Sequence, residues 1–95
     1  MNAFYAEFTA LPGCAAKVMS LLNQLTRHVR RKPSNLVFSA YRRSGCTDTS
    51  IVFEQYADEN ALNAHVTAPD TVRFNTDLLS LVERQCPVLN WLTPC

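Results

Sequence analysis

The sequence predicts a ferredoxin-like α+β domain, with the element order β-α-β-β-α-β and an antiparallel sheet. Four short segments have the apolar patterning of strands, and two longer segments repeat apolar residues every three or four positions. The 95 residues, 47 % of them hydrophobic, suffice for one folded domain over residues 1–95 and argue against a disordered chain.

The first strand is expected over residues 4–10, where every second residue is apolar, and Pro12-Gly13 ends the pattern. A helix is expected from Ala15 to about Lys32, because apolar residues recur at helical spacing. These residues are Val18, Leu21, Leu22, Leu25 and Val29. The basic run over residues 27–32, before Pro33, complements the negative end of the helix dipole. Binding of a phosphate or nucleic acid by this run is the alternative.

A hairpin and an interrupted helix are expected next. The strands cover residues 35–42 and 50–56, joined by a polar loop over residues 43–48. Asp58 is the predicted cap of a short helix, Pro69 interrupts it, and Asp70 is the predicted cap of a segment reaching about Gln85. The residues that this segment should bury are Val72, Phe74, Leu78, Leu81 and Val82. Pro87 ends it, and residues 88–92 form the last strand.

Charge and composition argue against several classes of function. Nine Lys and Arg against eight Asp and Glu give a net charge of +1, whereas nucleic-acid-binding proteins usually carry a basic excess. No run of about 18 apolar residues could span a membrane, and residues 1–7 lack the basic start of a signal peptide. We therefore expect a cytoplasmic protein without a nucleic-acid or membrane partner.

The cysteines, Cys14, Cys46, Cys86 and Cys95, are expected to be reduced, because the chain lacks a secretory signal. No Cys-x-x-Cys pair occurs and no His lies at zinc-ligand spacing, so the sequence predicts no metal site.

Both faces of the predicted sheet are apolar, which predicts a homodimer. In one strand Leu36, Phe38 and Ala40 oppose Val37 and Tyr41, and in the next Ile51 and Phe53 oppose Val52 and Tyr56. Two helices cover only one face, and a sheet whose second face is in water alternates cleanly between apolar and polar residues. A second copy of the chain is the simplest cover for the open face.

Glu54 and His65 are the residues best suited to chemistry. His65 follows Ala61 and Leu62 at helical spacing, beside the buried side of its helix, and Glu54 shares a strand face with Tyr56. A shielded carboxylate near an imidazole can form an acid/base pair in which the Glu orients the His. The structural alternative is that His65 donates to a backbone carbonyl and Glu54 pairs with an Arg across the sheet.

Residues 54–69, Glu-Gln-Tyr-Ala-Asp-Glu-Asn-Ala-Leu-Asn-Ala-His-Val-Thr-Ala-Pro, resemble a segment of the antibiotic biosynthesis monooxygenase (ABM) domain family. In that family a strand ending in Glu-x-Trp/Tyr leads to an acidic cap, Ala-Leu/Phe-x-x-His and Ser/Thr-x-Pro. Pro12-Gly13 and the run from Lys32 to Leu36 fit as well. The departures are Asp70, where a second His often follows the Pro, Tyr56 in place of Trp, and Ser34 in place of Gly.

The resemblance implies a subunit that pairs through its sheet into a dimeric α+β barrel. It also implies oxidation of a quinol or polycyclic phenol by molecular oxygen, with no cofactor, in which the deprotonated substrate provides the electron. By position, His65 and Glu54 would be the catalytic pair. The substrate-lining residues would be Phe53, Tyr56, Phe74 and Trp91, although aromatic residues in such patterns are more often core.

The expected function is therefore that of a cofactor-independent monooxygenase acting on a quinol or another electron-rich aromatic. One alternative is an isomerase of a small phosphorylated carbonyl compound, with His65 or Glu54 as proton shuttle and Arg42, Arg43 or Arg73 as phosphate anchor. Without a ligand, Arg73 would form only a surface ion pair with Asp77. The other alternative is a dimeric small-molecule-binding module without catalysis.

Overall fold

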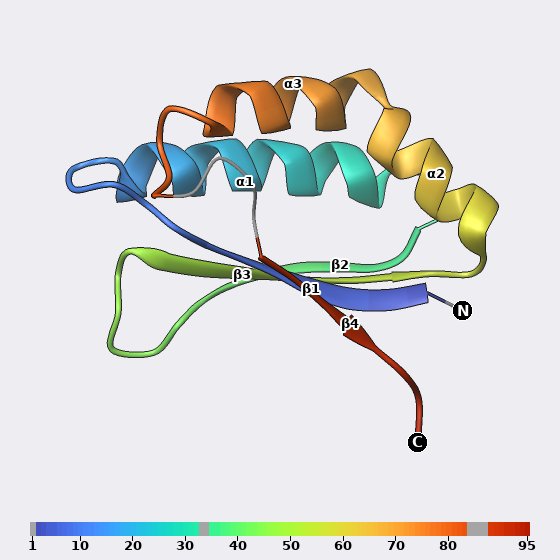
Figure 1. Cartoon of the computed structure of the whole chain (residues 1–95). Coiled ribbons are helices and arrows are strands. Elements are labelled where there is room, and N and C mark those ends of the chain that lie inside the picture. Colours follow the sequence, from blue (N-terminus) through green and yellow to red (C-terminus); the bar gives the residue numbers. More distant parts are fainter. Residues whose placement is uncertain (1, 33–34, 84–87) are drawn as a thin grey trace.

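Strands and helices follow one another in the predicted order in the computed structural model, which describes residues 2–32, 35–83 and 88–95 (Figure 1). The elements are β1 (Asn2–Thr9), α1 (Ala15–Arg30), β2 (Asn35–Arg42), β3 (Thr49–Tyr56), α2 (Glu59–Thr67), α3 (Pro69–Leu78) and β4 (Val88–Leu92). The ferredoxin-like α+β prediction is confirmed, with the second helix in two pieces.

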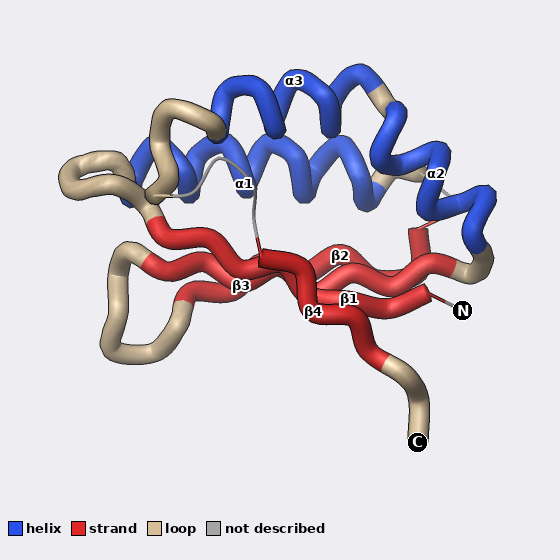
Figure 2. Tube along the Cα trace, in the orientation of Figure 1, coloured by secondary structure: helices blue, strands red, loops and turns tan. Residues whose placement is uncertain are grey.

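The sheet has the strand order β2-β3-β1-β4, and every neighbouring pair is antiparallel. In β1 the side chains of Phe4, Ala6 and Phe8 are buried and alternate with partly exposed ones, as the sequence predicts. The described helices α1, α2 and α3 lie on one face of the sheet (Figure 2). Val52, Glu54 and Tyr56 of β3 are buried with the same alternation, so they share the helix-covered face with the apolar residues of β1.

Helix α1 supplies the main apolar layer above the sheet. The side chains of Val18, Leu22, Leu25 and Val29 are buried, whereas Leu21 is only half-buried. Burial of an aliphatic side chain of this size contributes about 1.5–3 kcal/mol to folding. The helix ends at Arg30, two residues before the predicted end, and its basic last turn complements the helix dipole.

The boundary between α2 and α3 lies at Pro69. As predicted, Asp58 caps α2, because its Oδ1 accepts a hydrogen bond of 2.8 Å from the N–H of Ala61. Pro69 is the first residue of α3, a position where the missing N–H costs nothing. Asp70 therefore lies in the first turn of α3, and the cap position is Ala68 rather than the predicted Asp70.

Helix α3 is shorter than predicted. It ends at Leu78, and Leu81 is then buried in a turn and Val82 in an isolated bridge rather than in a helix. The N–H of Leu11 donates to the carbonyl of Leu81 at 2.8 Å, and Val82 forms a bridge with Ala10. Pairing with the end of β1 thus replaces the last helical turns. The predicted end at Gln85, together with Cys86 and Pro87, lies outside the described residues, as do Pro33 and Ser34.

Val72 differs from the predicted pattern of burial. Val72 is 51 % exposed, since α3 directs Thr71, Phe74 and Leu78 inward instead. In β2 a bulge falls between the pairings of Asn35 and Val37 with β3, and the predicted burial of Leu36 lies outside the described side chains.

The sheet face away from the helices is partly apolar, as the sequence predicts. Tyr5 lies opposite Phe53 across β1 and β3, and Ile51 lies opposite Tyr41 across β3 and β2. These side chains are half-buried or exposed, with Tyr41 at 59 %. None of the described helices covers this face (Figure 1), and none of them is long and apolar enough to cross a membrane.

Candidate active site

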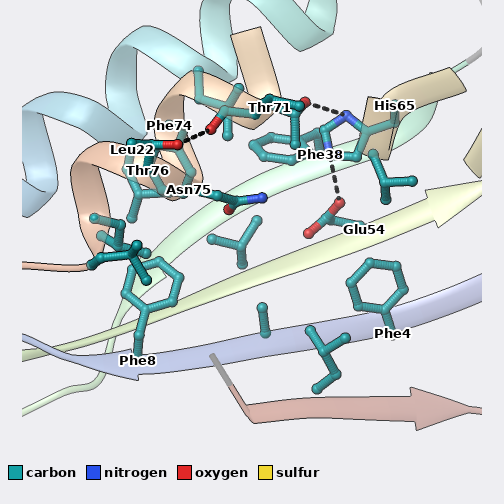
Figure 3. A pocket seen from close by; sticks show the side chains of 18 residues that line it. Phe4, Phe8, Leu22, Phe38, Glu54, His65, Thr71, Phe74, Asn75 and Thr76 are labelled. Carbon is teal, nitrogen blue, oxygen red and sulfur yellow. Dashed lines mark hydrogen bonds and ion pairs between the residues drawn. The ribbon is translucent and has the colours of Figure 1, made fainter. Parts of the chain in front are cut away.

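An apolar cavity of about 560 Å³ lies between the helices and the sheet. Four phenylalanines from three different elements line it: Phe4 and Phe8 of β1, Phe38 of β2 and Phe74 of α3. The rest of the wall is mostly aliphatic, and Glu54 and His65 lie at one end (Figure 3). Aromatic walls around a few polar groups are typical of sites for flat organic molecules.

Glu54 and His65 lie next to each other at the end of the cavity, in the arrangement that an acid/base pair needs. The Nε2 atom of His65 lies 3.3 Å from Oε1 of Glu54, and the side chains are only 9 % and 8 % exposed, respectively. Tyr56 strengthens the pair, because its hydroxyl donates to the same Oε1 at 2.7 Å. A carboxylate oxygen that accepts from neighbouring donors is stabilised within an apolar site.

The imidazole of His65 is fixed on several sides. Its Nδ1 lies 3.4 Å from the hydroxyl oxygen of Thr71. The ring stacks on Tyr56 at a centroid distance of 5.4 Å and meets Phe38 at 5.8 Å. These contacts hold the ring in one orientation at the cavity wall.

The helix break at Pro69 allows the contact between Thr71 and His65. In a continuous helix, residues six positions apart lie about 120° apart around the axis and about 9 Å apart along it. Because α3 starts in a new direction after α2, Thr71 comes to lie against the ring of His65 instead (Figure 3).

The second carboxylate oxygen of Glu54, Oε2, points into the cavity (Figure 3). Within the described residues it makes no hydrogen bond, whereas Oε1 accepts from Tyr56 and faces His65. Asn75 also extends its amide into the cavity from α3. An unpaired carboxylate oxygen in an apolar cavity is a hydrogen-bond acceptor for a ligand hydroxyl.

The other residues predicted to line a substrate site have different positions. Phe74 lines the cavity, whereas Tyr56 is not part of the lining and donates its hydroxyl hydrogen to Glu54. Phe53 lies on the opposite face of the sheet, beside Tyr5. Trp91 is 60 % exposed and packs its ring on Phe4 at 4.8 Å, outside the cavity lining.

The arginines predicted as phosphate anchors lie away from the cavity. Arg73 lines a separate shallow groove between α1 and α3. Arg43 pairs with Glu7 on the open side of the sheet, and neither it nor Arg42 is among the cavity-lining residues.

Sequence reasoning missed Thr71 and Asn75. Nothing in the pattern signals either residue, because their positions depend on the direction that α3 takes after Pro69. No group of three His, Cys, Asp or Glu side chains close enough to hold a metal ion occurs within residues 2–32, 35–83 and 88–95.

The sequence model of the antibiotic biosynthesis monooxygenase family matches residues 1–77. The match covers most of the chain, and the protein therefore belongs to the ABM family.

Solved structures reproduce the fold at low sequence identity. A crystal structure of an antibiotic biosynthesis monooxygenase has a TM-score of 0.92 at 16 % identity, covering 100 % of this chain and 99 % of that one. The structure of PA3566 from Pseudomonas aeruginosa has a TM-score of 0.91 at 21 % sequence identity, and the match covers 99 % of this chain and 93 % of that one. The structure of Rv0793 from Mycobacterium tuberculosis has a TM-score of 0.90 at 20 % sequence identity, and the match covers 99 % of this chain and 94 % of that one. No curated protein matches the sequence.

Proposed function

We propose that the protein is a cofactor-independent monooxygenase that oxidises a quinol or another electron-rich phenol with molecular oxygen. One observation carries the proposal: Glu54 turns a free carboxylate oxygen into an aromatic cavity while Tyr56 and His65 occupy its other oxygen. Family membership supports a small-molecule site in this fold. The substrate class follows from the chemistry of the cavity wall.

The cavity suits a flat substrate with a hydroxyl group. Its volume of about 560 Å³ lies within the range of about 300–1,000 Å³ that small-molecule sites occupy. The rings of Phe4, Phe38 and Phe74 would pack against an aromatic substrate. A substrate hydroxyl at the Glu54 end would donate to Oε2, so the same contact that orients the substrate also prepares it to lose its proton.

Loss of the proton makes the substrate reactive toward oxygen. The phenolate transfers an electron to molecular oxygen more readily than the phenol does, and the resulting superoxide and ring radical combine into a ring peroxide. Loss of water from the peroxide gives the hydroxylated quinone. In balance, one quinol and one oxygen molecule give one hydroxyquinone and one water. The protein orients the ring and holds the proton.

The isomerase alternative has no support from the cavity. None of the described residues that line it is Arg or Lys, so a phosphate group would lie there without a cationic partner. The oxygen-uptake assay described below distinguishes the monooxygenase from the binding module without catalysis.

We also propose that the protein forms a homodimer through the open face of the sheet. Tyr5, Ile51 and Phe53 leave apolar surface there. Asn90 pairs with Tyr5 in the sheet, and its Nδ2 is buried without an acceptor among the described residues, which a second copy could supply. Sedimentation at micromolar concentration should show a dimer, and a monomer would contradict the proposal. The cytoplasmic location is likewise proposed from the sequence alone.

Oxygen uptake with a panel of hydroquinones and naphthols tests the activity, with and without a chelator. We expect uptake that resists the chelator and is lost in Glu54→Gln. Asn63→Gln, on the exposed side of α2, is the control that should keep the wild-type rate. Tight binding of phenols without oxygen uptake would instead favour the non-catalytic binding module.

A further inference from the structure

We infer that Glu54, through Oε2, is the group that takes the substrate's proton, and that His65 is a positioning residue. The inference rests on the proposed function, because it assigns the roles within that site. It reverses the expectation from the sequence, in which the Glu orients the His and the imidazole acts as the base.

The first step concerns the two nitrogens of His65, both of which have partners. Nε2 lies 3.3 Å from Oε1 of Glu54, and Nδ1 lies 3.4 Å from the hydroxyl of Thr71. Nε2 faces the carboxylate at ion-pair distance, and an ionised carboxylate only accepts hydrogen bonds, so the arrangement favours the hydrogen on Nε2. The lone pair of the neutral ring is then on Nδ1, where it accepts from Thr71. His65 therefore has no lone pair directed at a substrate.

The second step concerns the two oxygens of Glu54, which differ in their surroundings. Oε1 receives the hydroxyl of Tyr56 at 2.7 Å and faces Nε2 of His65, whereas Oε2 points into the cavity (Figure 3). A substrate hydroxyl in the cavity meets Oε2 as the available acceptor in the Glu54–His65 pair. Hydrogen bonds from O–H to a carboxylate are short and strong, which favours transfer along this contact.

The third step is the proton transfer itself. The O–H bond of the substrate breaks and a bond from the proton to Oε2 forms, so the negative charge passes from the carboxylate to the phenolate oxygen. Oε1 becomes the carbonyl oxygen of the acid, still accepts from Tyr56 and still faces Nε2 of His65. No hydrogen bond in the network has to reverse its direction, so the site is organised for the transfer before the substrate arrives.

Thr71 completes the arrangement by fixing the ring of His65. Its hydroxyl donates to Nδ1 of the neutral imidazole and could accept from Nδ1–H of the protonated one. Thr71→Val keeps the shape but removes this partner, whereas Thr71→Ser restores it. Since the hydroxyl contacts the imidazole rather than the acceptor oxygen, Thr71→Val should lower kcat several-fold with little change in KM. Thr71→Ser should recover most of that loss.

The main test compares Glu54→Gln with His65→Gln in the full-length protein, with Asn63→Gln as the control. The first readout is kcat with a hydroquinone, and the second is the absorption spectrum of bound 4-nitrophenol below its own pKa. Glu54→Gln should lower kcat by about 10²–10⁴-fold and leave the bound probe as the phenol. His65→Gln, whose amide can still donate to Oε1, should cost less than about tenfold and keep the phenolate band. The reverse order of the two variants would overturn the inference.

A nitrogen NMR spectrum of the unliganded protein tests the positioning role without any substrate. The neutral ring of His65 should be the Nε2–H tautomer, and the exposed His28 provides the reference signal. An Nδ1–H tautomer would overturn the inference whatever the activity. A wild type that neither binds phenols nor oxidises quinols would overturn the proposed function and the proton-transfer step with it, even where the tautomer agrees.

Discussion

Replacing Tyr56 with Phe is the sharpest test of the hydrogen-bond network around Glu54. The tyrosine is almost completely buried, and its hydroxyl donates to Oε1 of Glu54 at 2.7 Å. Tyr56→Phe keeps the ring that stacks on His65 and removes only the hydroxyl. The variant therefore removes a hydrogen bond to a buried carboxylate and leaves the aromatic ring in place.

The expected loss of stability follows from the kind of bond that is removed. A hydrogen bond to a charged group contributes about 1.5–3 kcal/mol, and a loss of about 2 kcal/mol is expected for Tyr56→Phe. In a domain of this size each kcal/mol shifts the unfolding midpoint by about 4–8 °C, so Tm should fall by about 8–16 °C. Removing the hydroxyl of Tyr41, which is 59 % exposed, should change stability by less than about 0.5 kcal/mol.

Thermal unfolding followed by circular dichroism measures both variants at one pH and protein concentration. Equal concentrations matter because an oligomer changes its Tm with concentration. If Tyr56→Phe unfolds within a degree or two of Tyr41→Phe, the hydroxyl does not support the buried carboxylate, and the argument for an organised Oε1 fails.

Three further changes probe the cap, the core and the hairpin loop. Asp58→Ala removes the cap of α2 and should cost about 0.5–2 kcal/mol in urea unfolding; no loss would contradict the cap. Leu22→Ala should cost about 2–5 kcal/mol because the side chain is fully buried, whereas Leu79→Ala, half-exposed, should cost far less in the same assay. The Thr49 hydroxyl, and after it backbone N–H groups of the same turn, lower the pKa of Cys46. Its thiolate should therefore form at lower pH in folded than in denatured protein, so alkylation should begin at lower pH, and Thr49→Val should reduce the difference.

The fold could be predicted from local patterns because each pattern agrees with its tertiary context. The alternation of Phe4, Ala6 and Phe8 and the helical spacing of Val18 and Leu22 match the faces that they bury. The end of the last helix was predicted wrongly, because pairing with a distant segment of the chain outweighs the local helical pattern there. The residues after Leu78 leave the helix because they pair with the end of β1, and such long-range pairing leaves no local signal.

The candidate site could be predicted only as a pair of residues. The spacing of His65 from Ala61 and the alternation around Glu54 place both side chains on buried faces, and the structure brings them together at 3.3 Å. Phe53 and Trp91 were assigned to the lining by position in the family pattern, but strand alternation directs Phe53 to the other sheet face. Its odd-numbered position, opposite in phase to Glu54, already carried that signal.

The orientation of the imidazole within the pair depends on Thr71, and here the sequence offers little guidance. Pro69 marks a helix break, yet the direction of the next helix determines whether Thr71 meets the imidazole or the solvent. A hydroxyl can donate to Nδ1 or accept from it, so Thr71 fixes the position of the ring, whereas the carboxylate that faces Nε2 favours the hydrogen on that atom. With the ring held between Thr71 and Oε1 of Glu54, Oε2 is the acceptor that we propose for the substrate's proton. The helix break at Pro69 therefore determines how the imidazole is held against Glu54.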